Sequence, residues 1–412
     1  MRFTPHGLLG RRFWLLFSAS SLASVSTGAI TPILPQLIQN ELGHSATAVG
    51  MVVGAGSVLT VVANPLLGQF ADRFGRRTTA MVGTIVTAVS LLALVVTGSL
   101  FGVGAGRAFF GLGVIAINVA LTAWVVDATR DDDRGRALGM FGTSVWVGLA
   151  LGPQIGQILL HNIGFHAVWL ACAGMQLVGL ACIAAAPRRP RTARSERVRT
   201  AWRPVLSASV LPGAIAASAW AGESIMMSFL IPHLEDRGLA PSGLLSAASI
   251  FTVFAISVVG FRLLLGSLVD RFPPHLVSIV SLVATAAGYA VLAWADNFGV
   301  AALGAAILGC GFSPLYPALL LLVTRRLEPT NRAAGLGVFT SGVDVGMAGG
   351  VLAGGILIDL SGGSTALLGA AGFQLVAIAL LLSRRWATAG SDFGADLSPH
   401  RSDPRVGAGR TQ

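Results

Sequence analysis

Residues 68–77 read Gly-Gln-Phe-Ala-Asp-Arg-Phe-Gly-Arg-Arg, and they separate two long apolar segments. The stretch holds one acid and three arginines. A shorter copy, Gly-Ser-Leu-Val-Asp-Arg-Phe, occupies residues 266–272, 198 residues later. A charged motif that recurs once in each half of an apolar chain predicts a membrane protein built from two copies of one unit.

The composition indicates a bilayer as the solvent. Hydrophobic residues make up 54% of the 412 residues and charged ones 11%, whereas a soluble domain has about 25% charged residues. A membrane span must satisfy its own backbone as a helix or a closed barrel. The long unbroken apolar runs favour helices, since barrel strands alternate over roughly ten residues.

The net charge of +10 raises the question of a nucleic-acid partner. All 28 cationic residues are arginines, and they cluster in alternate loops between the apolar runs. This placement is typical of a signal for orientation in the membrane rather than of a nucleic-acid footprint. We therefore expect no nucleic-acid partner.

Membrane spans can be counted directly, because about 20 apolar helical residues cross a hydrocarbon core of about 30 Å. Twelve runs satisfy this requirement, at residues 13–38, 46–70, 78–97, 99–126, 137–160, 167–186, 206–232, 241–268, 275–294, 298–323, 334–358 and 364–383. The first run is too long for a signal peptide and lacks a clear cleavage site, so we expect it to be retained.

Arginines predict the orientation of these spans. They occur before the first run, in every second loop after it, throughout residues 187–204 and directly after the last run, whereas the opposite loops hold only Arg237. The positive-inside rule then places both termini in the cytoplasm, in the inner or plasma membrane of the cell. We expect the basic linker to contact anionic lipid headgroups as well.

An internal repeat divides the chain. At the offset of 198, Gly68 matches Gly266 and Asp72 matches Asp270, and a second region matches Gly148 to Gly346 and Gly152 to Gly350. We therefore predict an N-terminal six-helix bundle at 1–186, a basic cytoplasmic linker at 187–204, a C-terminal six-helix bundle at 205–386, and a disordered cytoplasmic tail at 387–412.

The pattern Gly-x-x-x-Asp-Arg-x-Gly-Arg-Arg resembles the loop between helices 2 and 3 of major facilitator superfamily transporters. The resemblance implies an all-α membrane protein with twelve spans, in which two parallel repeats face each other across a cavity. It also implies a cytoplasmic gate, in which Asp72 accepts hydrogen bonds at the start of the eleventh helix and Arg73 or Arg76 pairs with Asp127. The alternative is a basic loop that only sets the topology. The expected gate residues are Gly68, Asp72, Arg73, Gly75, Arg76, Asp127, Asp270 and Arg271.

Two further motifs lie inside the runs. Arg107 begins a stretch that resembles the superfamily pattern Arg-x-x-Gln-Gly-x-Gly, with Phe110 in place of Gln. A charge in a span by default faces a cavity; the alternative is an arginine that binds backbone carbonyls. The pattern Gly148-x-x-x-Gly152-Pro153-x-x-Gly156 resembles the motif of the drug–proton antiporter branch, with Gln157 where a second glycine is usual. Importers also contain such small-residue packing faces.

Two acids lie inside predicted spans, Glu223 in the seventh and Asp344 in the eleventh. Together with Arg107 they are the candidates for proton coupling or substrate binding, and Glu223 ranks first. Asp344 lies between two close glycines, so a structural role is the alternative. Antiporters that the chain resembles often carry this acid in the first span, which here has none. Weaker candidates are Asn64, Asn118, Gln154 and Arg262.

These observations predict a secondary transporter that exports a small organic compound or drug in exchange for protons. The alternative is a proton symporter or facilitator for a nutrient such as a sugar or organic acid, and a different class is a membrane sensor or membrane enzyme. The sequence contains no nucleophile–base constellation or nucleotide-binding loop, and His161, His166 and His233 are too dispersed for a metal site. We therefore expect no enzyme activity, no cofactor and no bound metal. The expected partners are a small-molecule substrate, protons and lipids, and the expected oligomeric state is a monomer.

Overall fold

A computed structural model describes residues 10–129, 134–187, 202–265, 271–328 and 331–383. The described residues form twelve α-helices and one π-helical turn, and no strand. The helices are α1 (Arg11–Gln36), α2 (Ala46–Phe74), α3 (Arg76–Val96), α4 (Leu100–Ala128), α5 (Arg134–Asn162), α6 (Phe165–Ala185), α7 (Trp202–Asp236), α8 (Ser249–Leu265), α10 (Pro274–Trp294), α11 (Phe298–Thr324), α12 (Arg332–Ser361) and α13 (Gly363–Leu382), and the π-helical turn η1 (Leu37–Glu41) extends α1.

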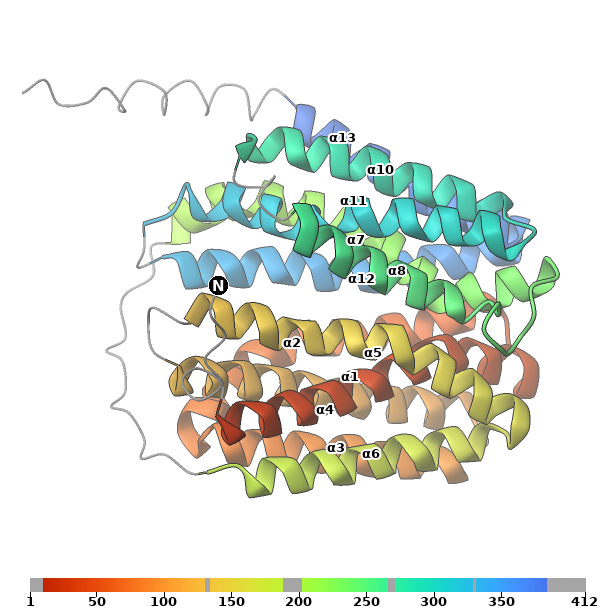
Figure 1. Cartoon of the computed structure of the whole chain (residues 1–412), viewed down its shortest axis with the longest axis horizontal. Helices are drawn as coiled ribbons and strands as arrows, with labels where there is room; N and C mark the ends of the chain where they lie inside the picture. The colour runs from red at the N-terminus through yellow and green to blue at the C-terminus, as the bar shows by residue number, and fades with distance from the viewer. Residues whose placement is uncertain (1–9, 130–133, 188–201, 266–270, 329–330, 384–412) are drawn as a thin grey trace, which may run out of the picture.

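The helices lie roughly side by side, with α1–α6 in one half of the molecule and α7–α13 in the other (Figure 1). The same packing pattern recurs in both halves. In the first, α1 packs on α5 and α6, and α3 packs on α4 and α6; in the second, α7 packs on α12 and α13, and α10 packs on α11 and α13. The expected all-helical fold is confirmed. The linker and tail fall mainly outside the described residues, so their boundaries stay a prediction.

The twelve predicted runs all fall on helices. Among the described residues, ten helices are long and apolar enough to cross a membrane, and parts of α2 and α8 form shorter apolar helices. The predicted start of the eighth run at residue 241 was wrong, because α8 begins at Ser249. Before it, Gly243 adopts a φ of +103° and Ala240 pairs with Ser246. Pro241 and Gly243 favour such a turn over a helix.

A single glycine joins α2 to α3. Gly75 has φ +97° and ψ 149°, and it is the C-cap of α2 as well as the N-cap of α3. Glycine lacks a Cβ and enters this region without strain, whereas other residues do so at a cost. The turn therefore requires the glycine at the eighth position of the motif.

Glycine faces hold the long helices of each half together. A Cβ on Gly152 of α5 would lie 2.7 Å from backbone atoms of Gly28 and Ala29 in α1. At the matching position of the second half, a Cβ on Gly350 of α12 would lie 2.2 Å from the Ala221 carbonyl oxygen in α7. Both halves thus use small residues to bring two backbones together, as is usual in membranes.

Candidate functional site

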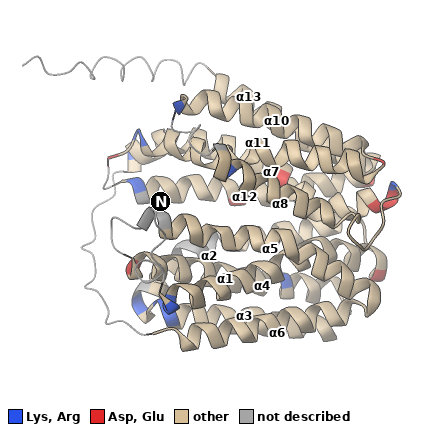
Figure 2. Cartoon of the chain, in the orientation of Figure 1, with Lys and Arg blue, Asp and Glu red and all other residues tan. Residues whose placement is uncertain are grey.

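Charged residues concentrate at the two ends of the helices, with few along the middle (Figure 2). The end at which α2 passes into α3 carries Arg73, Arg76 and Arg77 and is called the basic end below. The opposite end, at which α2 begins and α12 finishes, is called the far end.

At the far end, Asp359 of α12 caps the N-terminus of α2. Its Oδ1 accepts from the Ala46 backbone N–H at 2.9 Å, and its Oδ2 accepts from the Thr47 N–H at 2.8 Å and from the Thr47 hydroxyl at 2.6 Å. The first N–H groups of a helix have no partner within it, and the helix dipole favours an anion there. The two halves of the molecule are therefore joined here by a carboxylate.

Close backbone packing extends this contact along α2 and α12. A Cβ on Gly355 would lie 2.3 Å from the Ala46 carbonyl oxygen, and one on Gly50 would lie 2.7 Å from the Cα of Leu352. The expected site list did not include these positions, because an inter-half contact of glycine with backbone has no local sequence signal.

Helices α5 and α8 form a second contact between the halves. The Gln154 amide donates to the Ser249 hydroxyl at 2.5 Å, and the Thr252 hydroxyl donates to the Ala150 carbonyl at 2.6 Å. Gln154, considered a weaker candidate for the cavity, thus forms a polar bridge to the second half.

At the basic end, Arg76 Nε lies 3.4 Å from the Asp127 carboxylate, at the end of α4. Arg77 donates to the Ala184 carbonyl at the end of α6, and Arg73 lies over the ring of Phe74. The resemblance left Arg73 and Arg76 open as the partner of Asp127, and the structure places Arg76 there.

The rest of the expected gate is only partly visible. The side chain of Asp72 and residues 266–270, which include Asp270, lie outside the described part of the chain, and Arg271 is exposed at the start of the following segment. A Cβ on Gly68 would meet no atom within 4 Å. The close approach expected of Gly68 is therefore not made in this conformation, and the gate stays a prediction.

Among the described residues, the three charges inside the spans form no ion pair with one another. Arg107, Glu223 and Asp344 are each half-buried, and within the described residues none of the three forms a hydrogen bond or ion pair. The Arg107 guanidinium lies 5.6 Å from the Phe110 ring centre, and its stem packs against Gly56 of α2. The structure thus places Arg107 in the first half and both acids in the second.

A tyrosine packs beside Glu223. Gly222, next to Glu223, packs against the ring of Tyr289 and the amide of Gln374. The Tyr289 hydroxyl is buried and has no hydrogen-bond partner among the described residues. The surroundings of Glu223 therefore include a buried phenol.

An aromatic cluster lies in the second half, and Arg262 connects the second half to Trp146 of the first half. The Trp220 ring lies 5.1 Å from Phe312 and 5.8 Å from Tyr316. Arg262, another of the weaker candidates, lies over the ring of Trp146 in the first half at 5.7 Å and donates to the Ser313 carbonyl. Cation–π contact of this kind is favourable when water is excluded.

Sequence reasoning missed Asp359 and the two tyrosines. Asp359 lies one residue beyond the predicted run 334–358, at the external end of the span under the predicted topology. An acid at the external end of a predicted span was the sequence signal that could have identified Asp359. Tyr289 and Tyr316 are the only two tyrosines in the chain, and both fall inside predicted spans.

Comparison with known proteins adds independent findings. A family model described as Major Facilitator Superfamily matches residues 16–328 and 214–393. The chain is 27% identical over 380 residues to an uncharacterized MFS-type transporter, YhhS, of Escherichia coli K12. The alignment covers 90% of this chain and 91% of the relative. A second uncharacterized MFS-type transporter, from Salmonella typhimurium, is 27% identical over 344 residues and covers 80% of this chain and 84% of the relative.

Solved structures show the same fold at low sequence identity. A bacterial homolog of the human lysosomal transporter Spinster, in an inward-facing and unoccupied conformation, superposes with a TM-score of 0.77 and 16% identity, over 93% of this chain and 99% of the other. The nucleoside transporter NupG superposes with a TM-score of 0.73 and 17% identity, over 90% and 98%.

Proposed function

Because the chain belongs to the major facilitator superfamily, we propose that this membrane transporter exports a small organic compound or drug in exchange for protons. The glycine–proline face of α5 is the observation that favours export over import. Gly148, Gly152 and Gly156 pack directly on α1, and the pattern around Pro153 resembles that of drug–proton antiporters.

The orientation follows from the arginines. The basic end is cytoplasmic and the far end is external, since arginine-rich loops remain on the cytoplasmic side. The cell membrane is the location consistent with this orientation, with both termini inside, and the transporter works as a monomer in contact with lipid.

Alternating access is the mechanism, with one six-helix half rocking against the other. Asp359 and the α5–α8 contacts close the external side in the described conformation, which is therefore the inward-facing state. In the outward-facing state the cytoplasmic gate closes instead: Asp72 caps the start of α12, and Gly68 allows the close approach. The Arg76–Asp127 pair holds the loop that carries this gate.

Glu223 is the proton-coupling group. A carboxylate that no cation neutralises is costly inside a membrane span and by default marks a functional site, of which a proton relay is one kind. Tyr289 packs against the adjacent Gly222, and Asp344 is the second candidate. Arg107, in the other half, holds an anionic part of the substrate or favours the deprotonated acid when the two halves change position.

Proteoliposomes with an imposed pH gradient test the proposal. Each compound of a broad panel, including cationic and amphiphilic drugs, is placed on one side, and its flux is followed with and without the gradient. Accumulation against the direction of proton flow supports antiport. Accumulation together with protons would establish a symporter, and the absence of flux for every compound would favour a sensor.

A further inference from the structure

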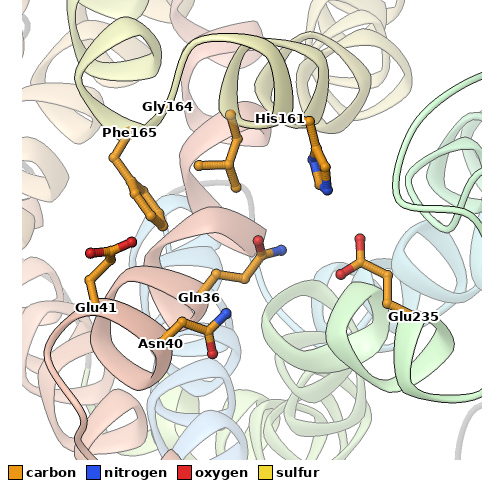
Figure 3. A pocket seen from close by; sticks show the side chains of 8 residues that line it. Gln36, Asn40, Glu41, His161, Gly164, Phe165 and Glu235 are labelled. Carbon is orange, nitrogen blue, oxygen red and sulfur yellow. The ribbon is translucent and has the colours of Figure 1, made fainter.

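A polar cavity opens at the far end, and one of its lining residues, Glu235, lies on α7, about three helical turns beyond Glu223. Its volume is about 350 Å³, and its lining includes Gln36, Asn40, Glu41, His161, Phe165 and Glu235. This volume lies within the range of about 300–1,000 Å³ that is usual for small-molecule sites. Figure 3 shows the side chains directed into a common space.

The cavity contains a buried donor without an acceptor. Gln36 is 7% exposed, and its Nε2 has no hydrogen-bond partner among the described residues. In Figure 3 its amide points into the space between His161 and Glu235. A buried amide without a partner costs free energy, so an acceptor atom bound in this cavity would stabilise the amide.

The cavity also contains an acceptor without a donor. Glu235 Oε1 is buried and has no partner within the described part of the chain. Glu41 brings a second carboxylate to the lining. His161 Nδ1 lies 3.2 Å from the Gln157 carbonyl oxygen, which can only accept, so Nδ1 carries the hydrogen and Nε2 of the neutral ring is free to accept.

No arginine lines the cavity to neutralise these acids. Arg237 is near in sequence to Glu235, but its guanidinium donates to the carbonyls of Ala295 and Trp294 and to the Ser364 hydroxyl. The lining therefore favours a cation. A metal ion is disfavoured, because no three His, Cys, Asp or Glu side chains of the described residues come together as ligands. The Phe165 ring suits an organic cation instead.

We propose that this cavity binds a small organic ammonium ion that also carries an oxygen acceptor. The ammonium group donates to Glu235 and to His161 Nε2, the Glu41 carboxylate adds negative charge to the lining, and the oxygen accepts from Gln36 Nε2. Because Glu41 and His161 belong to the first half and Glu235 to the second, the ligand bridges the halves. A ligand that binds one conformation preferentially shifts the population toward it, so the occupied site holds the external side closed.

The binding test does not depend on the direction or coupling of transport. Wild-type protein in nanodiscs is titrated with 6-amino-1-hexanol, and its thermal unfolding is followed. Two comparison ligands are titrated in the same way. In 1,6-hexanediol a neutral hydroxyl replaces the ammonium group, and hexylammonium keeps the ammonium group but lacks the hydroxyl oxygen. We expect a saturable rise in Tm with the amino alcohol, and binding weaker by about tenfold or more for the diol, because a charge-assisted hydrogen bond is lost.

Variants assign the binding to the cavity. Glu235→Gln should weaken amino alcohol binding by about tenfold and Glu41→Gln by less, whereas Gln36→Leu should weaken it toward the affinity for hexylammonium. Asp236→Asn is the matched control, because Asp236 is adjacent to Glu235, exposed and not part of the lining. Equal binding by Glu235→Gln and wild type, or equal binding of the diol, would overturn the proposal.

Two further measurements test whether the cavity is occupied and whether the ligand holds the external side closed. With the native cysteines removed, an Asn40→Cys variant should react more slowly with a thiol reagent when the amino alcohol is present. Spin labels at His44 and Leu360, exposed positions beside the α2–α12 contact, should report a larger closed population; this last arm rests on the alternating-access proposal. Unchanged labelling at position 40 would overturn the site, and stabilisation by Ca²⁺ or Mg²⁺ but not by the amino alcohol would overturn the ligand class.

Discussion

The Asp359 carboxylate accepts two hydrogen bonds from Thr47, one from the backbone N–H at 2.8 Å and one from the hydroxyl at 2.6 Å. This contact between α12 and α2 joins the halves at the far end. The proposed contact of Asp72 would join the same two helices at the basic end. If the proposal holds, one helix pair would carry a carboxylate for each closed state.

Asp359→Asn should open the far end. An anion at an exposed helix N-terminus contributes about 0.3–1 kcal/mol, so its loss should shift the conformational equilibrium about two- to fivefold. Distances between spin labels at His44 and Leu360 measure the shift. Thr47→Val, which removes only the hydroxyl bond, should have a smaller effect, and Asp296→Asn is the control in the loop between α10 and α11. An unchanged distance distribution in Asp359→Asn would reduce this contact to local packing.

Asp72→Asn should shift the equilibrium in the opposite direction, toward the described conformation. Turnover should fall strongly, while protein abundance and substrate binding persist, because the contact contributes only about 0.3–2 kcal/mol. Combining it with Asp359→Asn should bring the distance distribution back toward wild type. Wild-type transport by the single variant would mean that the motif loop only sets the topology.

Glu223→Gln and Asp344→Asn should separate the two acids. The variant that neutralises the coupling group should lose gradient-driven accumulation in proteoliposomes yet still bind substrate. We expect this loss for Glu223→Gln, and a Tyr289→Phe variant should show a milder defect because the nearby phenol is removed. If the double mutant remains driven by the proton gradient, neither acid couples and antiport is wrong.

Gly152→Ala should destabilise the first half. The new Cβ would lie 2.7 Å from the α1 backbone, and overpacking of this kind costs about 1–3 kcal/mol. Thermal unfolding in detergent measures the loss. Gly142→Ala in the same helix is the control, because a Cβ there meets no atom within 4 Å. Equal melting temperatures for the two variants would contradict the packing role.

Cysteine labelling in intact cells checks the orientation. After removal of Cys172, Cys182 and Cys310, single cysteines at positions 43, 98 and 164 should react with an impermeant reagent, whereas one at 192 should react only after the membrane is opened. The reason is the arginine content of the cytoplasmic loops. Labelling of position 192 ahead of position 43 would reverse the topology.

The predictable part of the molecule is the part that depends on the bilayer. Apolar runs inside a bilayer have to form helices, and each of the twelve predicted runs overlaps a helix. Only the start of the eighth run was misplaced. Pro241 and the positive φ of Gly243 form a turn before α8, and a count of apolar residues does not register such a turn. The glycine faces at Gly152 and Gly350 were also visible, because their spacing places them on one side of a helix.

Partnership between distant residues was decided only by the tertiary structure. Arg76 rather than Arg73 reaches Asp127, since helix rotation selects between neighbours in sequence. Asp359 meets α2 across 312 residues, and Arg107 forms no ion pair with Glu223 or Asp344 within the described part of the chain. Such contacts depend on how the two halves are placed in one conformation. Sequence alone determined that the chain crosses the membrane as a repeated set of helices, and the packing of the halves decided where the two halves touch and which charges meet.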